Sequence, residues 1–257
     1  MSKKIVSFAV MFLLVSVSFA SSLTVEDVVK NMQSNQSKIK DMYSEMTTTI
    51  TSNLSMPNSA NKGPQTMVQK SKMWTKGTDK SKIEVLSPTK QTTITNGNMM
   101  TMIDPSSGQK VTQDMSNLPA GKAGIKGQSG MTGNASMNLA KALEMFDMTV
   151  SQKDALYIME AKPKKTNPVI GKMSFFIDPA RWLPIKIIIY TPQGKDLSRA
   201  QSREMSTTEM EYSEVNGIWV ATKTTSAVKT PMGSMSTEMI LENIKVNQGI
   251  GDGEFDG

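Results

Sequence analysis

The sequence predicts a mainly β protein with helices: an incomplete, half-open antiparallel β-barrel of about 11–12 strands with helices covering the concave face. Three observations predict this fold. Thr-rich, β-branched segments that alternate apolar and polar residues recur along most of the chain. Turn residues separate these segments at short intervals. Two segments have helical periodicity, and two helices can cover so large an apolar sheet face only if they lie inside its curve.

Twelve segments have the alternation of strands. They are 43–54, 65–76, 80–86, 90–96, 98–103, 109–114, 155–162, 170–178, 184–191, 196–214, 218–230 and 234–246. Asn96-Gly97 and Asn216-Gly217 are strong hairpin signals, because both central residues of the tight turn must accept a positive φ. Residues 104–108 form another turn. The Gly-bearing segment 115–135 predicts a loop, and the acidic, Gly-rich tail 249–257 predicts a frayed end.

Two segments predict helices. The first runs from Thr24 to Met42 and begins with a capping-box pattern of Thr24 and Asp27. Its apolar stripe contains Val25, Val28, Val29, Met32, Ile39 and Met42. Polar residues 34–37 weaken the middle of that stripe. The second helix is expected over 136–147, with Leu139, Leu143 and Phe146 on one face.

The first 20 residues indicate export from the cytoplasm. Lys3 and Lys4 precede an apolar run, 5–17, and small residues precede the expected cleavage site after Ala20. A retained membrane anchor is the alternative, but the run is shorter than the ~20 residues that span a bilayer. We expect a signal peptide, 1–20, and a single periplasmic domain, 21–257. Because the chain has no Cys, no lipid is expected at the cleavage site.

Composition narrows the classes of function. The chain has neither Cys nor His, which excludes the usual zinc ligands and Ser-His-Asp or Cys-His catalysis. No cofactor, metal or catalytic residue is expected. Glu209 and Glu211 share a face of one strand, but that face is expected to be solvated, so we do not predict an enzyme. The basic residues are scattered rather than gathered into a stripe, so no nucleic-acid partner is expected.

Several short motifs occur in the order found in one family. They are the helix-to-strand passage 28–50, the segment 73–80 around Trp74, 91–97 with Ile103-Asp104-Pro105, 176–179 through Trp182-Leu183-Pro184-Ile185, and 216–220 with 243–247. Together they cover most of residues 21–257. In these motifs the chain resembles the periplasmic outer-membrane lipoprotein carrier and lipoprotein-sorting proteins (LolA/LolB-like).

The resemblance implies an incomplete β-barrel with a helical lid that binds acyl chains inside. Lipoprotein or lipid acyl chains would be the ligand, and an inner-membrane release complex and an outer-membrane acceptor would be the partners. One position departs from the carriers, which have Arg where this chain has Gly77. We therefore do not extend two properties of the carriers to this chain: closing of the lid through that Arg, and exchange with the usual release machinery.

The candidate ligand-binding residues are apolar side chains that alternation sends to one sheet face, with others from the second helix. They are Met46, Ile50, Ile83, Val85, Ile94, Phe175, Ile177, Ile187 and Ile189 on the sheet and Leu139, Leu143 and Phe146 on the lid. For each, ordinary core packing is the alternative. Trp74, Trp182 and Trp219 are interpreted as structural anchors. The 23 Met residues suit an adaptable apolar lining.

The preferred hypothesis is a periplasmic carrier that buries acyl chains reversibly and transfers them towards the outer membrane. Each buried methylene contributes about 0.8 kcal/mol, so one acyl chain could contribute roughly ten kcal/mol before the costs of binding. An envelope sensor or interaction module on the same fold is the alternative, which would detect lipoproteins and signal to a membrane partner. A carboxylate hydrolase is the third hypothesis.

Overall fold

One antiparallel sheet contains every strand in the part of the chain that the structure describes. The structure is a computed structural model, and it describes residues 23–54, 63–116, 143–192, 203–230 and 232–257. The elements are α1 (Val25–Gln36), β1 (Asp41–Leu54), β2 (Gln65–Lys76), β3 (Lys80–Ser87), β4 (Gln91–Asn96), β5 (Met99–Asp104), β6 (Gln109–Asp114), β7 (Phe146–Lys153), β8 (Leu156–Pro163), β9 (Lys172–Asp178), β10 (Leu183–Tyr190), β11 (Glu204–Val215), β12 (Ile218–Thr230), β13 (Gly233–Val246) and the short 3₁₀ helix η2 (Asp252–Phe255). The predicted signal peptide lies outside the described residues.

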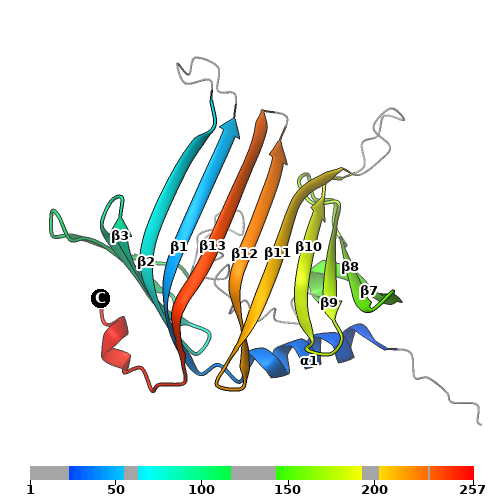
Figure 1. Ribbon diagram of the computed structural model, residues 1–257, viewed down its shortest axis with the longest axis horizontal. Coiled ribbons are helices and arrows are strands. Elements are labelled where there is room, and N and C mark those ends of the chain that lie inside the picture. Colours follow the sequence, from blue (N-terminus) through cyan, green and yellow to red (C-terminus); the bar gives the residue numbers. More distant parts are fainter. Residues whose placement is uncertain (1–22, 55–62, 117–142, 193–202, 231) are drawn as a thin grey trace, which may run out of the picture.

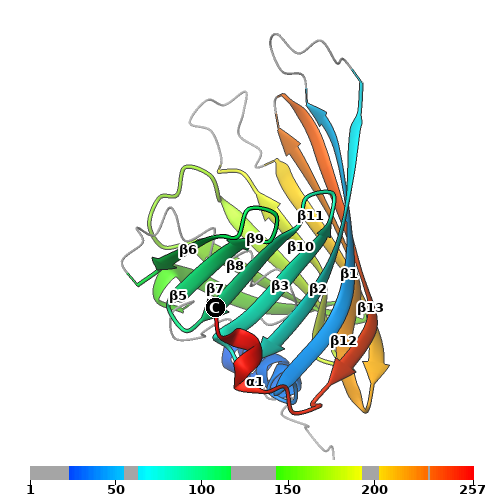
Figure 2. The same ribbon diagram turned by 90° about the vertical axis from the view of Figure 1, so that its left-hand side faces the viewer.

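The sheet is open, with β6 at one edge and β7 at the other. Its 13 strands run in the order β6-β5-β4-β3-β2-β1-β13-β12-β11-β10-β9-β8-β7. β1 and β13, from opposite ends of the chain, pair along nearly their whole length at the centre (Figure 1). The arms β3–β6 and β7–β10 extend to the same side of this central wall (Figure 2). The half-open antiparallel barrel expected from the sequence is confirmed.

Irregularities in strand pairing favour the curvature. The register shifts between Tyr43 and Glu45 in β1, between Pro184 and Lys186 in β10, and between Glu211 and Tyr212 in β11. An extra residue at such a point bends its strand and increases the local right-handed twist. Alternation then sends one set of side chains to the concave face and the other set to the convex face.

The helix α1 starts as expected but ends earlier. The Thr24 hydroxyl accepts from the Asp27 N–H at 3.1 Å, and the Asp27 carboxylate accepts from the Thr24 N–H at 3.2 Å. The helix ends at Gln36, whereas the expected helix continued to Met42. Residues 34–37 are polar and give the helix no further apolar stripe to bury. Met42 instead lies in β1, pairing with Val246.

The second expected helix is wrong at its C-terminal end. Residues 143–145 are helical, but Phe146 begins β7, a strand that the sequence analysis missed. Phe146, Met148 and Val150 alternate on β7 and pack on the same apolar cluster, so the two-residue period was the better signal. Residues 136–142 lie outside the described residues.

The tight hairpins are confirmed with one adjustment. Asn216 and Gly217 both have positive φ, 53° and 75°, and they form the whole connection between β11 and β12. In the first hairpin Asn96 stays in β4, and Gly97, with φ 60°, and Asn98 make the turn. At the predicted 104–108 turn, the Asp104 carboxylate accepts from the Ser106 N–H at 2.8 Å.

The C-terminal segment is ordered, so the expectation of a frayed tail is wrong. Phe255 is 1% exposed, and η2 lies against β3 and β4. Asp252 accepts from Lys76 and Lys80, both at 2.9 Å, and Glu254 from Lys82 at 3.2 Å. Composition suggested a mobile end, but one aromatic residue and two carboxylates are enough to attach the segment to the convex face.

Candidate functional site

A cavity lies between α1 and the concave face of β8–β13. Its volume is about 370 Å³. Apolar and aromatic side chains dominate the lining, and β11 contributes residues at alternate positions. The lining comprises Val29, Met32, Gln33, Asn35 and Gln36 of α1, Ile39, Met42 of β1, Met159 of β8, Phe175 of β9, Trp182, Leu183, Pro184, Ile187 and Ile189 in and beside β10, Thr208, Met210 and Tyr212 of β11, Trp219, Val220, Ala221 and Thr224 of β12, and Leu241 of β13.

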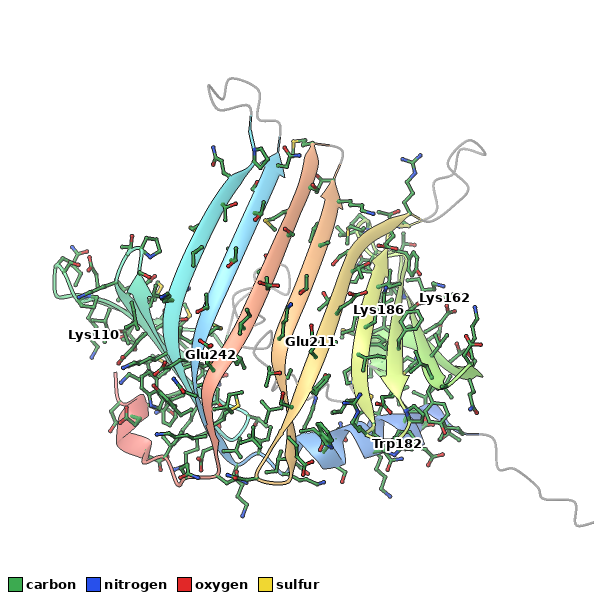
Figure 3. All side chains as sticks on the ribbon, in the orientation of Figure 1. Lys110, Lys162, Trp182, Lys186, Glu211 and Glu242 are labelled. Carbon is green, nitrogen blue, oxygen red and sulfur yellow. The ribbon has the colours of Figure 1, made fainter. Side chains whose placement is uncertain are left out.

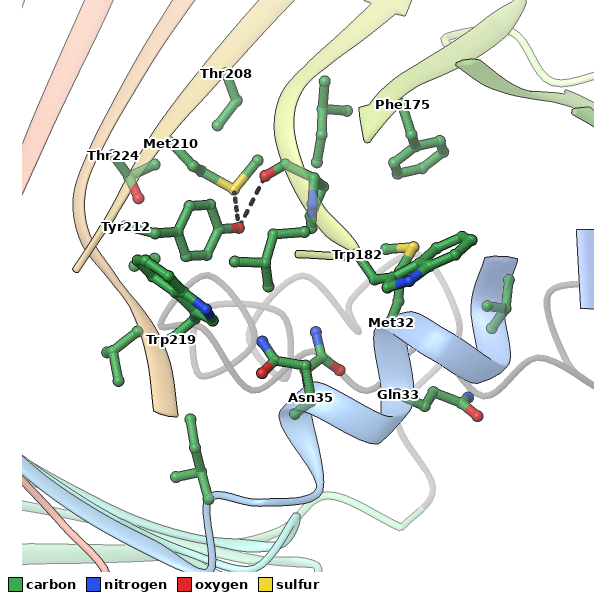
Figure 4. A pocket seen from close by; sticks show the side chains of 18 of the residues that line it. Met32, Gln33, Asn35, Phe175, Trp182, Thr208, Met210, Tyr212, Trp219 and Thr224 are labelled. Atoms are coloured by element: carbon green, nitrogen blue, oxygen red, sulfur yellow. Dashed lines mark hydrogen bonds between the residues drawn. The ribbon is translucent and has the colours of Figure 1, made fainter. Parts of the chain in front are cut away.

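The register explains why these side chains meet. Ile187 pairs with Phe175 on one side and with Thr208 on the other, so all three point to the same face. Met210 pairs with Thr224 in the same way. Figure 4 shows Phe175, Thr208, Met210 and Thr224 arranged above the α1 residues. The cavity is therefore a product of sheet curvature and alternation, closed from below by one helix.

The helix α1 closes the cavity with two different stretches. At its N-terminal half, Val28 and Val29 are buried and join a cluster with Met159, Phe175 and Ile177. At its C-terminal half, Asn35 and Gln36 line the open volume instead. The segment after the helix is anchored by Asn247, whose side chain accepts from the Lys40 N–H at 2.7 Å and donates to the Lys38 carbonyl at 2.9 Å.

Two tryptophans and a tyrosine shape the wall. The Tyr212 hydroxyl donates to the Pro184 carbonyl at 2.8 Å, and its oxygen lies 3.5 Å from Met210 Sδ (Figure 4). Burial raises the pKa of Tyr212 above its ordinary value, with Arg181 opposing the shift, so the hydroxyl remains a donor at neutral pH. Trp182 has φ 55° and stacks on Tyr157 at 5.3 Å between ring centroids.

The basic residue Arg181 lies beside this wall. The Arg181 guanidinium is 5.1 Å from the Trp219 ring centroid, and its Nε donates to Asp178 at 2.6 Å. Burial favours the neutral form of Asp178, but the hydrogen bonds from Arg181 and from the Ala180 N–H outweigh it and lower the pKa of that carboxyl. Arg181 is therefore held in an ion pair and is not among the residues lining the cavity.

The structure brings some predicted site residues together and separates others. Phe175, Ile187 and Ile189 line the cavity. Ile177 and Phe146 belong to the buried cluster beneath α1 rather than to the lining. Met46 pairs with Leu241, which lines the cavity, and Ile50 lies four pairs further along β1, opposite Thr237.

The other predicted positions lie elsewhere. Ile83 and Val85 are on the concave face of β3, across from Met73 and Ser71 of β2, and are not among the lining residues. Ile94 pairs with Lys82 and is on the convex face, the face against which η2 packs, so its placement in the cavity is corrected. The alternation was right, but nothing local distinguishes the two faces of β4.

The remaining predicted site residues are the lid positions Leu143 and Leu139. Leu143 is half-buried, and its carbonyl accepts from Lys164 Nζ at 2.6 Å. Leu139 lies outside the described residues.

Sequence reasoning missed several lining residues. Trp182 and Trp219, interpreted as anchors, line the cavity, whereas Trp74 lies on the convex face, tilted against Tyr43 with Lys82 over its ring. Asn35 was also missed. Its signal was visible, because positions 28, 32 and 35 follow helical spacing and place an amide on the apolar stripe.

The convex face carries the charges. Lys186 lies 2.9 Å from Glu209, and Lys223 lies 3.7 Å from Glu211 and 3.2 Å from Glu238. Figure 3 shows Lys186, Glu211 and Glu242 projecting from β10, β11 and β13. The Glu209 and Glu211 pair considered for catalysis is exposed and ion-paired, as expected for a solvated face. In the described ranges, no group of three or more acidic residues could hold a metal ion.

No helix within the described residues is long and apolar enough to cross a bilayer. A family model described as "-like: Uncharacterized protein" matches residues 137–257. No curated protein sequence is significantly similar to the chain.

Solved structures with the same architecture include proteins from three bacteria. A DUF1329 family protein from Desulfovibrio piger aligns with a TM-score of 0.59 and 17% identity over 90% of this chain and 95% of that one. A LolA superfamily protein from Nitrosomonas europaea aligns with a TM-score of 0.55 and 13% identity over 92% of this chain and 99% of that one. A putative outer membrane lipoprotein-sorting protein domain from Vibrio parahaemolyticus aligns with a TM-score of 0.53 and 15% identity over 90% of this chain and 97% of that one. The chain therefore has the fold shared by LolA superfamily and lipoprotein-sorting proteins, as the sequence motifs implied.

Proposed function

We propose that the protein is a periplasmic carrier that binds the acyl chain of a lipoprotein or lipid beneath α1 and transfers it towards the outer membrane. One observation carries the proposal: an apolar cavity of about 370 Å³ under an amphipathic helix. This volume lies near the lower end of the ~300–1,000 Å³ typical of ligand pockets. It suits one acyl chain better than several.

The cavity favours a chain over a reactive substrate. Its described lining contains no Asp, Glu, Lys or Arg, so it offers no charged group for acid–base chemistry. The aliphatic and Met side chains provide adaptable apolar contacts. Burial of methylenes, at about 0.8 kcal/mol each, supplies the driving force for transfer from water. We expect binding without covalent chemistry.

The attachment of α1 suits reversible opening. The helix body packs on the sheet through Val28 and Val29, while its C-terminal end is held by the Asn247 hydrogen bonds to Lys38 and Lys40. Apolar contacts have no directional requirement, so the helix can separate from the sheet while its anchored end stays in place. Loading and release would then be movements of α1, with an inner-membrane release complex and an outer-membrane acceptor as the expected partners.

The test is acyl binding by the exported form of the protein. Native mass spectrometry and a fluorescent fatty-acyl probe should both detect a bound chain. Phe175→Asp should abolish binding, because a carboxylate in the cavity cannot keep its hydration when the chain enters.

Phe176→Asp is the matched control, since Phe176 is the next residue of β9 and points to the opposite face. This variant should retain binding. Absence of acyl binding to folded wild-type protein by both methods would contradict the carrier. Recovery of a membrane signalling protein without lipidated cargo would favour the sensor hypothesis instead.

A further inference from the structure

Among the described residues that line the cavity, Asn35 is the buried polar side chain, and it has no evident use in binding a hydrocarbon. Asn35 lies in the last turn of α1 and is 8% exposed. Within the described part of the chain, Asn35 makes its hydrogen bonds through its backbone. Its carbonyl accepts from the Lys38 N–H at 3.3 Å, outside the helix ladder. Its side chain lines the cavity, on the helix side (Figure 4).

Two other polar side chains of the lining, Tyr212 and Thr208, differ from Asn35, because their bonds are made within the protein. The Tyr212 hydroxyl donates to the Pro184 carbonyl, and the Thr208 and Ser226 hydroxyls lie 2.9 Å apart. A buried amide in an apolar cavity is unfavourable unless it is hydrogen-bonded. A ligand that brings its own carbonyl to Asn35 would remove that penalty on binding.

The lining also constrains the charge of the ligand. No described lining residue is cationic, and Arg181 nearby is already paired with Asp178. An ionised carboxylate inside the cavity would therefore lack a counter-charge, which is costly in an apolar environment. A neutral ester or amide carbonyl carries no such cost, and the Asn35 amide can donate to it.

We propose that Asn35 recognises the neutral carbonyl that joins an acyl chain to its carrier molecule, so that the cavity selects ester- or amide-linked chains over free fatty acids. This inference rests on the proposed function. The linked chain can come from a glyceride lipid or from the acylated end of a lipoprotein, since both present a neutral carbonyl next to the first methylene.

A matched pair of ligands isolates the carbonyl. 1-Palmitoylglycerol has an ester carbonyl, and 1-O-hexadecylglycerol has an ether in its place with the same chain and headgroup. Wild-type protein should bind the ester about tenfold more tightly, the effect of one net hydrogen bond. Competition with a fluorescent acyl probe measures both affinities. Palmitate at neutral pH should bind more weakly than the ester.

Variants on one helix provide the protein side of the test. Asn35→Leu should reduce the ester-to-ether ratio to about one while it keeps affinity for the ether. Asn31→Leu, the same change one turn earlier and outside the lining, should leave the tenfold ratio intact. Circular dichroism and thermal unfolding verify that each variant is folded.

The outcomes separate this inference from the carrier proposal. Equal binding of ester and ether by wild-type protein, or an unchanged ratio in Asn35→Leu, overturns the role of Asn35 and leaves the carrier intact. Failure of every chain to bind overturns both. An N-palmitoyl peptide distinguishes the sources: tighter binding than the glyceride identifies a lipoprotein, weaker binding identifies a lipid, and either affinity should fall in Asn35→Leu.

Discussion

The two ends of the chain cover opposite faces of the sheet, and they do so in different ways. The helix α1 covers the concave face through apolar side chains and leaves a cavity behind it. The segment η2 covers the convex face with buried Phe255 and with ion pairs from Asp252 and Glu254 to lysines of β2 and β3. On the proposed function, α1 would serve as the removable cover at the N-terminal end and η2 as the fixed cover at the C-terminal end.

Removal of the aromatic anchor should have the largest effect on stability. Phe255→Ala is expected to lower the free energy of unfolding by about 3 kcal/mol, the low end for loss of a buried Phe, because the segment is peripheral. Urea unfolding measures the loss. Acyl binding should be unchanged, since the cavity is on the other face. A parallel loss of ligand affinity would mean that the two covers are coupled.

A change on the removable cover should affect both the stability of the protein and its hold on the ligand. Val28→Ala removes two methyl groups from a fully buried position and should cost about 2 kcal/mol. Because the same contacts hold α1 against the sheet, bound acyl probe should also dissociate faster. Stopped-flow release measures this rate. A smaller loss of unfolding free energy in Phe255→Ala than in Val28→Ala would reverse the order expected for the two covers.

The capping box offers a milder test of the same cover. Thr24→Ala removes the hydroxyl that accepts from the Asp27 N–H and should cost about 1 kcal/mol of helix stability. Hydrogen exchange should increase in the first turn of α1 and remain unchanged in η2. Thr24→Ser keeps an accepting hydroxyl and serves as the control. Exchange that rises equally in both segments would argue against separate covers.

Acid should loosen the fixed cover by a small amount. Hydrogen bonds from Lys80 and Lys76 lower the pKa of Asp252 from 3.8 to about 2. Its contribution is therefore complete above pH 4 and is lost as the pH falls through 2. Protection of the C-terminal peptide in hydrogen exchange should decrease over this window. Asp252→Asn should remove that part of the pH dependence, and an unchanged profile would exclude the ion pair as its source.

Local patterns predicted most of the fold. Eleven of the twelve expected strands correspond to elements of the sheet within a few residues, because alternation and turn chemistry are encoded in short windows. The expected strand 196–214 corresponds to β11, which begins only at Glu204, and residues 196–202 lie outside the described residues. At β7 the apolar residues fit two periods, and packing against the cluster around Met159 and Phe175 determined which one formed. Beyond α1, Ile39 and Met42 pack on a different cluster with Met73, so the chain leaves the helix for β1.

The candidate site could be predicted only in part. Phe175, Ile187 and Ile189 followed from alternation, whereas Ile94 was assigned to the wrong face. Alternation divides a strand into two sets of residues but does not say which set faces the helix. Trp182, Tyr212 and Trp219 come from one turn and two strands, and their convergence depends on bulges that no local signal revealed.

The sequence by itself determined the element types, the hairpin turns, the absence of Cys and His chemistry, and the resemblance to lipoprotein-sorting proteins. These follow from local backbone preferences and from which side chains are present. Only the tertiary structure decided which sheet face is hollow, where Asn35 lies, and that Phe255 attaches the C-terminal segment. Those features depend on contacts between residues far apart in the chain, and the curvature that brings them together is a property of the whole sheet.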